Sequence, residues 1–374
     1  MRVERLSLTS FRSYSTLDVS FSGGPQVVVG SNATGKTSLL ESILVLGTAR
    51  SHRAGQDGEL VAWGAEFARL EADVGATAQG SDRIELLITR TAAGGGRKRV
   101  LVNGVARRPS SLASTLPVVL FAPEDMLLVV GSPGLRRTSL DTLIGQTVPA
   151  SMTTMSSYAR ALTQRNNLLR QVREGTAAPD ELRYWDEVVI NDGAQIVDWR
   201  RAALAQLARP LSAAHQEIAP GEEPLELRYV TNAEPQLAET TRDALRRRLI
   251  DTREKEMWNG ATLIGPHRDD IAFVSDEREL ASSASRGQQR TAILAYKLAQ
   301  LDLLTASVGQ PPLLLLDDVF SELDPDRRAH LVRRIGALPQ AFVTTTTTDD
   351  LDPALVAAST VWTVSPGQLR QGEQ

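Results

Sequence analysis

The segment GSNATGKT at residues 30–37 fits G-x-x-x-x-G-K-[ST], a loop whose backbone N–H groups surround the phosphates of a nucleotide. Residues 26–29 predict the strand that leads into this loop, and residues 36–46 carry apolar side chains at helical spacing. Lys36 is placed to reach the β and γ phosphates, and Thr37 to hold magnesium through its hydroxyl. We therefore expect a site for ATP and Mg2+ that comprises Gly30, Ser31, Asn32, Ala33, Thr34, Gly35, Lys36, Thr37 and Ser38.

A second motif, LLLLDD at residues 313–318, places two carboxylates at the end of an apolar run. Such a run is typical of a buried strand in a parallel sheet. Two adjacent acids at a strand end can be an ordinary solvated turn, but after four leucines they are costly unless a cation neutralises them. We expect Asp317 to bind magnesium, directly or through water, and Asp318 to act as the base that orients the attacking water.

The long separation between these motifs indicates a large insertion within the nucleotide-binding fold. The intervening sequence is rich in Ala, Leu, Arg and Glu, with helices expected at 136–146, 150–173, 180–209 and 236–258. Pro210 is expected to end the third of these helices. The predicted fold class is α/β, with an ATPase head made of residues 1–130 and 260–374 and an inserted, mainly helical arm at 131–259.

Composition restricts the remaining classes of protein. The 374 residues include no cysteine, which excludes disulfides and thiolate metal sites and suits a reducing cytosol. No run of about 18 apolar residues predicts a membrane span, and the N-terminal stretch lacks the apolar core of a signal peptide. We therefore expect a cytoplasmic protein with no membrane partner. The net charge of −4 does not by itself indicate nucleic-acid binding, which would depend on basic clusters that share one surface.

A third motif, SRGQQ at residues 285–289, opens an apolar helix that is expected at 287–304. Taken alone, it is a serine-capped helix start. Together with SELD at 321–324 and the two phosphate motifs, it makes the sequence resemble the ABC-type ATPases, specifically the heads of the chromosome-maintenance and repair branch. The resemblance implies that the γ-phosphate held by a second subunit is faced by Ser285, Gly287 and Gln288. A helix N-terminus with a hydroxyl and glycine amides suits an anion.

Further motifs narrow the resemblance to the RecF recombination-mediator family, and they occur in the family's order over nearly the whole chain. They are FRSY (11–14), GSNATGKTSLLESI (30–43), ARSHR (49–53), FAPEDM (121–126), GSPGLRR (131–137), GPHRDD (265–270), ASRGQQR (284–290) and DDVFSELD (317–324). GPHRDD and SRGQQR together are highly specific. The resemblance implies an ABC-type fold and an ATP-dependent homodimer that binds duplex DNA and gap junctions. It also implies work with RecR and RecO to place RecA on gapped DNA during repair.

Two positions depart from most ABC ATPases. Asp318 stands where most have glutamate, and the threonines at 344–348 stand where many have a switch histidine. We therefore expect slow, DNA-dependent ATP hydrolysis that is used as a switch.

Glu124 occupies a place that other members fill with glutamine, and we expect it near the magnesium and the attacking water. His267 is either a turn histidine or a contact near the SRGQQ helix that senses the dimer.

Arginine pairs that flank the root of the arm are the expected DNA contacts, namely Arg107, Arg108, Arg136 and Arg137. Each pair is also compatible with an ordinary solvated surface. Two other functions remain as alternatives. A transporter-type ABC ATPase subunit would need a shorter helical insertion and a membrane partner. A nucleotide-dependent nuclease of the overcoming-lysogenisation type would need an extra acidic metal-binding domain.

Overall fold

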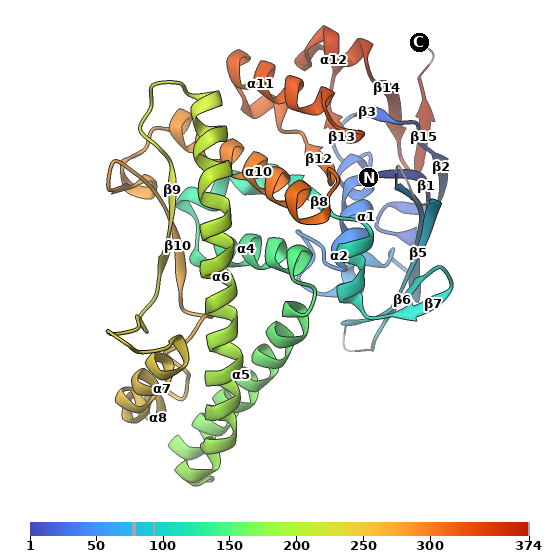
Figure 1. Ribbon diagram of the computed structural model, residues 1–374. Coiled ribbons are helices and arrows are strands. Elements are labelled where there is room, and N and C mark those ends of the chain that lie inside the picture. The colour runs from blue at the N-terminus through green and yellow to red at the C-terminus, as the bar shows by residue number, and fades with distance from the viewer. Residues whose placement is uncertain (77–79, 93, 373–374) are drawn as a thin grey trace. The chain divides into compact units, whose positions relative to one another are not determined.

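The computed structural model describes residues 1–76, 80–92 and 94–372, and the chain divides into two compact units (Figure 1). The first unit comprises residues 1–126, 213–222 and 286–374, and the second comprises residues 127–212 and 223–285. Residues 260–285 group with the helical insertion because β10 (Asp270–Ser275) is hydrogen-bonded to β9 (Glu226–Val230).

A six-stranded sheet positions the nucleotide motifs in the first unit. Its order is β15-β14-β3-β13-β12-β8, and neighbouring strands are parallel except at the edge strand β15. The strands are β3 (Gly24–Val29), β8 (Val118–Phe121), β12 (Leu313–Asp317), β13 (Gln340–Thr345), β14 (Thr360–Ser365) and β15 (Gln368–Gln371). Because β13 pairs with both β3 and β12, the carboxyl ends of these three parallel strands meet at one edge, where α/β sheets commonly bind ligands.

An antiparallel sheet in the same unit has the order β2-β1-β4-β5-β6-β7. It comprises β1 (Arg2–Phe11), β2 (Tyr14–Ser20), β4 (Phe67–Ala76), β5 (Gly80–Arg90), β6 (Gly96–Val102) and β7 (Val105–Arg107). One face buries leucines, and the opposite face carries ion pairs such as Arg5–Asp18 and Arg69–Glu85. This alternation is what an antiparallel sheet with one solvated face requires.

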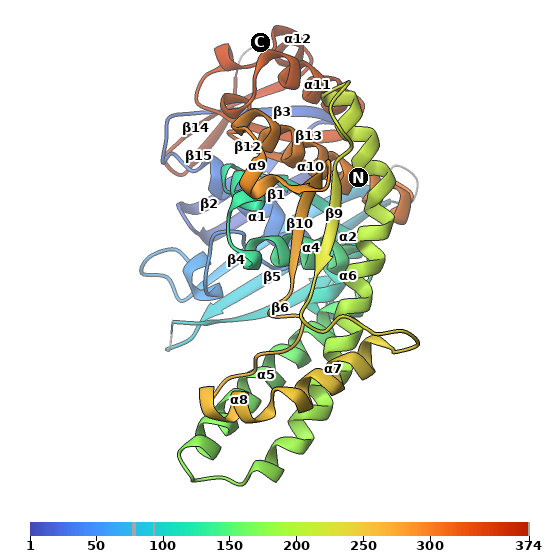
Figure 2. The same cartoon turned by 90° about the vertical axis from the view of Figure 1, so that its left-hand side faces the viewer.

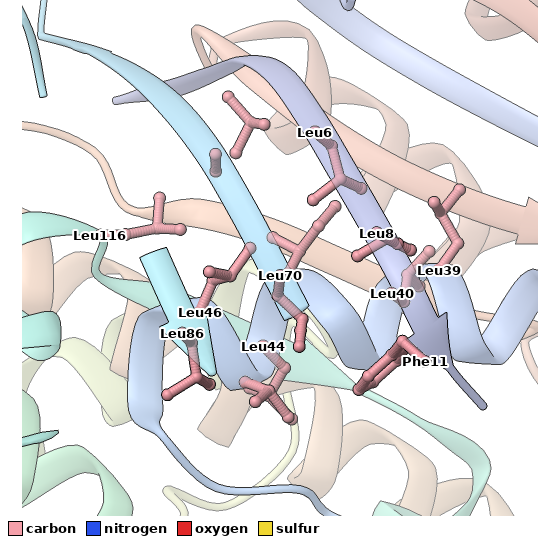
Figure 3. Packing of buried hydrophobic residues seen from close by; sticks show 14 of the residues in the cluster. Leu6, Leu8, Phe11, Leu39, Leu40, Leu44, Leu46, Leu70, Leu86 and Leu116 are labelled. Atoms are coloured by element: carbon pink, nitrogen blue, oxygen red, sulfur yellow. The ribbon is translucent and has the colours of Figure 1, made fainter. Parts of the chain in front are cut away.

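Helix α1 (Lys36–Thr48) packs into the apolar core that these two sheets share (Figure 3). Leu39, Leu40, Leu44 and Leu46 contribute to this core together with leucines of β1, β4 and β5. The same cluster includes Phe342 of β13. Burying one such side chain contributes about 1.5–3 kcal/mol, so the helix that carries the phosphate loop is held firmly from both sides.

Two more helices of the first unit begin within or directly after the SRGQQ and SELD motifs. Helix α10 (Arg286–Val308) is buried over most of its length and packs on β8. Helix α11 (Pro325–Gly336) has Asp324 as its N-cap, where Asp324 Oδ1 accepts a hydrogen bond from the Arg327 N–H at 3.0 Å. The shorter helices are α2 (Leu112–Thr115) and α12 (Pro353–Ala357).

Helices dominate the second unit. They are α3 (Leu127–Val130), α4 (Pro133–Thr147), α5 (Ser151–Arg173), most of α6 (Arg183–Ile218), α7 (Thr241–Asp251), α8 (Arg253–Asn259) and α9 (Leu280–Ser283). Helices α5 and α6 lie side by side (Figure 2), with Tyr158 and Ala161 packed against Val189 and Ile196. Strands β9, β10 and β11 (Arg278–Glu279) form a three-stranded antiparallel sheet.

Two predictions about helix ends were wrong. Helix α6 continues through Pro210, although a proline inside a helix costs about 3 kcal/mol, and burial of Leu207 and Leu211 on either side offsets this cost. The region 236–258 forms two helices that meet at Thr252.

Across the described part of the chain, we find no helix with both the length and the apolar character needed to cross a membrane.

Candidate nucleotide site

The phosphate loop adopts a conformation that requires glycine at one position. Gly35 has a φ of 115°, and a Cβ at this residue would lie 3.0 Å from both Ser13 Oγ and Tyr14 Oη. Tyr14 Oη also donates a hydrogen bond to the Gly35 carbonyl at 3.1 Å. The FRSY motif therefore supports the loop from the β1–β2 turn, a role that the sequence did not predict because the contact joins distant residues.

Lys36 begins α1, and its ammonium reaches back across the loop. Nζ donates to the Gly30 carbonyl at 2.5 Å and to the Ser31 carbonyl at 3.1 Å. Burial lowers the pKa of the Lys36 ammonium, and the negative charges of Asp318 and Asp317 oppose that shift. The cation of the first motif and the carboxylates of the second therefore share one electrostatic environment.

Asp317 and Asp318 have different surroundings at the end of β12. Asp317 is only 5% exposed, and its Oδ1 accepts a hydrogen bond from Thr344 Oγ1 at 2.7 Å. Asp318 is partly exposed and has a φ of 52°, a conformation that is uncommon for residues with a side chain. Its N–H donates to the Thr344 carbonyl at 3.2 Å and to Thr344 Oγ1 at 3.0 Å. Burial raises the pKa of Asp318, the Lys36 ammonium opposes this shift, and the charge of Asp317 adds to it.

Thr344 is a positioning residue that no sequence pattern assigned. It is one of the threonines at 344–348, which stand where many ABC ATPases have a switch histidine. In the structure its hydroxyl bonds Asp317, and the Thr344 backbone and side chain both accept from the Asp318 N–H. The next hydroxyl, Thr345 Oγ1, donates to the Thr347 carbonyl at 2.8 Å. The register of β13 beside β12 brings Thr344 opposite Asp317.

The Asp317 carboxylate and the Thr37 hydroxyl fit a magnesium ion that takes most of its ligands from the nucleotide and from water. Within residues 1–76, 80–92 and 94–372, no group of three or more His, Cys, Asp or Glu could hold a metal. Asp317 and Thr37 would instead supply one carboxylate and one hydroxyl. This matches the usual preference of Mg2+ for one or two protein carboxylates, with phosphate oxygens and water completing its shell.

A buried carboxylate anchors the loop that follows α1. Glu41 is fully buried, and its two oxygens accept from Arg12 Nε at 2.9 Å and Arg12 Nη2 at 2.7 Å. Ser51 Oγ also donates to Glu41, and it accepts from the backbone N–H groups of Arg53 and Ala54 at 2.9 and 2.8 Å. The ARSHR segment is therefore fixed to α1 and to the FRSY turn.

His52 lies on this anchored loop, and no sequence pattern assigned a role to it. Both ring nitrogens are buried and have no hydrogen-bond partner. Burial lowers the pKa of His52, while the carboxylates of Glu41, Glu124 and Asp317 act in the opposite direction. A buried polar group without a partner costs roughly 1–3 kcal/mol, so His52 is a residue with unused hydrogen-bonding capacity within reach of the charge of Asp317.

Glu124 lies in the short 3-10 helix at Pro123–Met126 and is exposed. The next residue, Asp125, is bound on both sides, because Oδ2 accepts from the Ala122 N–H at 2.8 Å and Oδ1 pairs with Lys297 Nζ at 2.7 Å. Lys297 belongs to α10, so this ion pair joins α10 to the end of β8. The charge of Glu124 acts on His52, where it opposes the lowering of the pKa of that imidazole by burial.

The SRGQQ segment is largely accessible at the start of α10. Ser285 and Gln288 are exposed, and Gly287 is partly exposed. The carbonyl of Gly287 accepts from Arg327 Nη2 at 3.2 Å, which connects α10 to α11. Arg290 also pairs with Glu322 at 2.9 Å, so the SRGQQR and SELD motifs meet within one chain.

The four candidate DNA contacts have different surroundings. Arg107 and Arg108 are exposed at the end of β7. Arg136 instead donates to both oxygens of Asp270 and to three backbone carbonyls, and Arg137 Nη1 donates to the Asp269 carbonyl at 2.6 Å. The guanidinium of Arg136 is therefore engaged inside the second unit.

The GPHRDD motif forms a polar cluster of the second unit. His267 Nδ1 and Tyr158 Oη share a hydrogen bond of 2.7 Å, and burial lowers the pKa of His267 to about 4. The Pro266 carbonyl accepts from Arg200 at 2.7 Å, and Tyr229 Oη donates to Asp269 at 2.6 Å. These contacts connect the motif to α5, α6 and β9.

Comparison with known proteins agrees with this arrangement. The family model described as "RecF/RecN/SMC N terminal domain" matches residues 2–366. The "DNA replication and repair protein RecF" of Halalkalibacterium halodurans is 38% identical over 99% of this chain and 100% of its own length. The protein of the same name from Bacillus subtilis is 36% identical over 99% of this chain and 100% of its own length.

Solved structures give the same result. The chain superposes on "the recombination mediator protein RecF-ATP in RecFOR pathway" with a TM-score of 0.88 and 28% identity, covering 99% of this chain and 97% of that one. An Smc head bound to part of ScpA has a TM-score of 0.53 at 16% identity over 100% of this chain and 98% of that one, which shows a shared fold. The fold is thus that of an ABC-type ATPase head with an insertion, and the chain belongs to the RecF family within the wider RecF/RecN/SMC group.

Proposed function

We propose that this protein is an ATP-dependent, DNA-binding ATPase of recombinational repair, in which slow hydrolysis acts as a switch. The observation that carries this proposal is the meeting of Lys36, Asp317 and Asp318 at one edge of the parallel sheet. Their mutual effects on pKa support a common phosphate and metal site. Full-length similarity to RecF proteins supports the role in DNA repair, and it favours this function over a transporter subunit or a nuclease.

Each residue of the site has a distinct task in this proposal. The backbone of residues 30–38 encloses the phosphates, and Lys36 neutralises the β and γ positions. Thr37 and Asp317 would hold Mg2+, which screens phosphate charge when bound. Asp318 accepts the proton of the attacking water, and its raised pKa makes it a stronger base than an ordinary aspartate. Glu124, whose charge acts on His52 as that of Asp317 does, would help to orient the water.

We propose that the active form is a homodimer in which ATP is bound between two copies. The accessible N-terminus of α10, with Ser285, Gly287 and Gln288, would face the γ-phosphate on the partner. The first unit would serve as the ATPase head and most of the second unit as the arm. DNA would be bound as a duplex or at gap junctions, with RecR and RecO assisting delivery of RecA.

Sedimentation velocity of the purified protein tests this proposal directly. We expect a dimer with ATP and a monomer with ADP or without nucleotide, with gapped DNA favouring the dimer further. Lys36→Ala removes the charge opposite the phosphates and should abolish both ATP binding and the ATP-dependent dimer. Undiminished binding of a fluorescent ATP analogue by Lys36→Ala would contradict the phosphate-loop assignment.

A further inference from the structure

A small apolar surface is exposed in the second unit at the joint between α3 and α4. Leu127 and Val130 of α3 and Leu135 of α4 are 49%, 48% and 39% exposed. We infer that these three residues, here called the α3–α4 surface, contact a second copy of the chain in the ATP-bound dimer. The inference rests on the proposed homodimer, and it names an apolar part of the contact between the two copies.

The joint between the two helices requires glycine at one position. A Cβ at Gly131 would lie 2.4 Å from the Leu127 carbonyl oxygen, 3.2 Å from Leu127 Cβ and 3.0 Å from Leu135 Cδ1. Any side chain at this position would therefore force α3 and α4 apart. Because Gly131 has none, Leu127 and Leu135 both lie within contact distance of the same point, and the exposed side chains form one patch.

Helix α3 is apolar on every side, although its own chain covers only half of it. Leu128 and Val129 are buried, whereas Leu127 and Val130 are about half exposed. A helix that is apolar all round is typically buried. Single apolar residues scattered over a surface need no explanation, but contiguous ones indicate a contact site. The exposed side of α3 therefore calls for a partner surface.

Arg136 holds the joint in place. Its Nη1 donates to three backbone carbonyls of residues 128–131 at 2.8 to 3.3 Å, and its Nε donates to Asp270 Oδ1 at 2.7 Å. Asp270 begins β10, so the α3–α4 surface is fixed to the sheet of the second unit. A surface that is already ordered loses little conformational entropy when it binds.

The position of this surface favours a second copy as its partner. Helix α3 packs on α9, and Ser285, which follows α9 by two residues, begins the motif that would face the nucleotide of the other copy. Glu124, which is expected near the nucleotide of its own chain, lies three residues before Leu127. Packing and sequence thus join α3 to two segments that the dimer would bring to its nucleotides. DNA is a poor alternative, because aliphatic side chains cannot donate hydrogen bonds to phosphates.

Charged substitutions test the inference in the full-length protein. Val130→Glu and Leu127→Glu would each bury a carboxylate where the copies meet, so ATP-dependent dimerisation measured by sedimentation velocity should be at least about tenfold weaker. The affinity of the monomer for a fluorescent ATP analogue should be unchanged, and Val130→Ile should dimerise like the wild type. Ile250→Glu is the matched control, since Ile250 is a 66% exposed aliphatic residue of α7 and should dimerise normally.

Thiol protection gives a second measurement, because the chain has no cysteine of its own. In Val130→Cys, ATP should slow alkylation by a maleimide at protein concentrations that give the dimer. Neither ADP, nor ATP at concentrations that leave the protein monomeric, should slow it. Ile250→Cys should react at the same rate under all of these conditions.

The outcomes separate this inference from the homodimer itself. Equal dimerisation of Val130→Glu and the wild type, or an unprotected Val130→Cys in the dimer, would overturn the inference and leave the homodimer standing. Protection of Val130→Cys by ATP in the monomer would overturn it too, since a change within one chain would then cover the surface. A wild-type protein that stays monomeric with saturating ATP would remove the proposed homodimer, and the inference with it.

Discussion

Asp317 and Asp318 are neighbours in sequence, but they differ in backbone geometry and in surroundings. Asp317 continues β12 and is buried against Thr344, whereas Asp318 turns away with a φ of 52°. Aspartate and asparagine adopt this left-handed conformation more readily than most residues. Single-residue geometry therefore allows one carboxylate to hold the metal while the other stays partly exposed to meet water.

Asp318→Asn tests this division of roles without disturbing the backbone. Asparagine tolerates the same φ, so we expect ATP binding to be retained, hydrolysis to fall by about a hundredfold and the ATP-bound dimer to accumulate. Steady-state phosphate release and sedimentation with saturating ATP measure these effects. A variant that stays monomeric with saturating ATP would show that the roles of the two aspartates are assigned incorrectly.

At the scale of secondary-structure elements, α10 connects several parts of the first unit. Its buried middle packs on β8, Lys297 pairs with Asp125, and Arg290 pairs with Glu322. Its N-terminus, by contrast, remains accessible. An element fixed along its length and accessible at its positive end is suited to present amides to an anion on another subunit.

Ser285→Arg should prevent the N-terminus of α10 from facing the nucleotide of a second subunit, without affecting ATP binding by the monomer. A bulky cation there obstructs closure, so we expect normal ATP affinity of the monomer but dimerisation at least about tenfold weaker, with hydrolysis lost accordingly. Nucleotide titration and sedimentation distinguish the two effects. Ser282→Arg is the control, because Ser282 is exposed three residues earlier and should dimerise normally. Equal loss of monomer binding would mean that Ser285 acts on its own chain's nucleotide.

The sequence predicted those elements whose patterns are local. The strand and helix on either side of the loop at 30–37, the buried strand at 313–316 and the apolar helix α10 are all confirmed. Contacts between distant residues could not be predicted, because no local pattern records them. Thr344 on Asp317 and Arg136 on Asp270 are of this kind, and the continuation of α6 through Pro210 likewise depends on tertiary burial.

At the scale of the whole molecule, ATP and DNA binding should be coupled. If ATP joins two copies and DNA binds the joined form better, each ligand must increase the affinity for the other by the same factor. Contacts from arginine to phosphate would give little base preference and a steep dependence on salt. Arg107 and Arg108 are exposed residues with which this can be examined.

Replacing both residues, Arg107→Glu with Arg108→Glu, should lower DNA affinity about tenfold or more and reduce its salt dependence, while ATP binding stays unchanged. Filter-binding titrations at several salt concentrations, with ATP and with ADP, measure this. A matched control is Arg242→Glu with Arg246→Glu, because both arginines already contact Glu187. DNA affinity that does not depend on nucleotide would refute the coupled mechanism, though not the ATPase.

The order of the parallel sheet also has a consequence for how the protein is made on the ribosome. Strand β3 carries the phosphate loop near the start of the chain, but both of its neighbours, β13 and β14, lie after residue 339. At about 5–20 residues per second, β3 emerges tens of seconds before either of them and must wait unpaired, with its apolar side chains uncovered. The antiparallel sheet of β1, β2 and β4 to β7 is local and can form during that interval. We therefore expect a nascent chain to bind ATP only after β13 and β14 have been synthesised, and a product that ends before residue 340 to leave β3 exposed to chaperones and proteases.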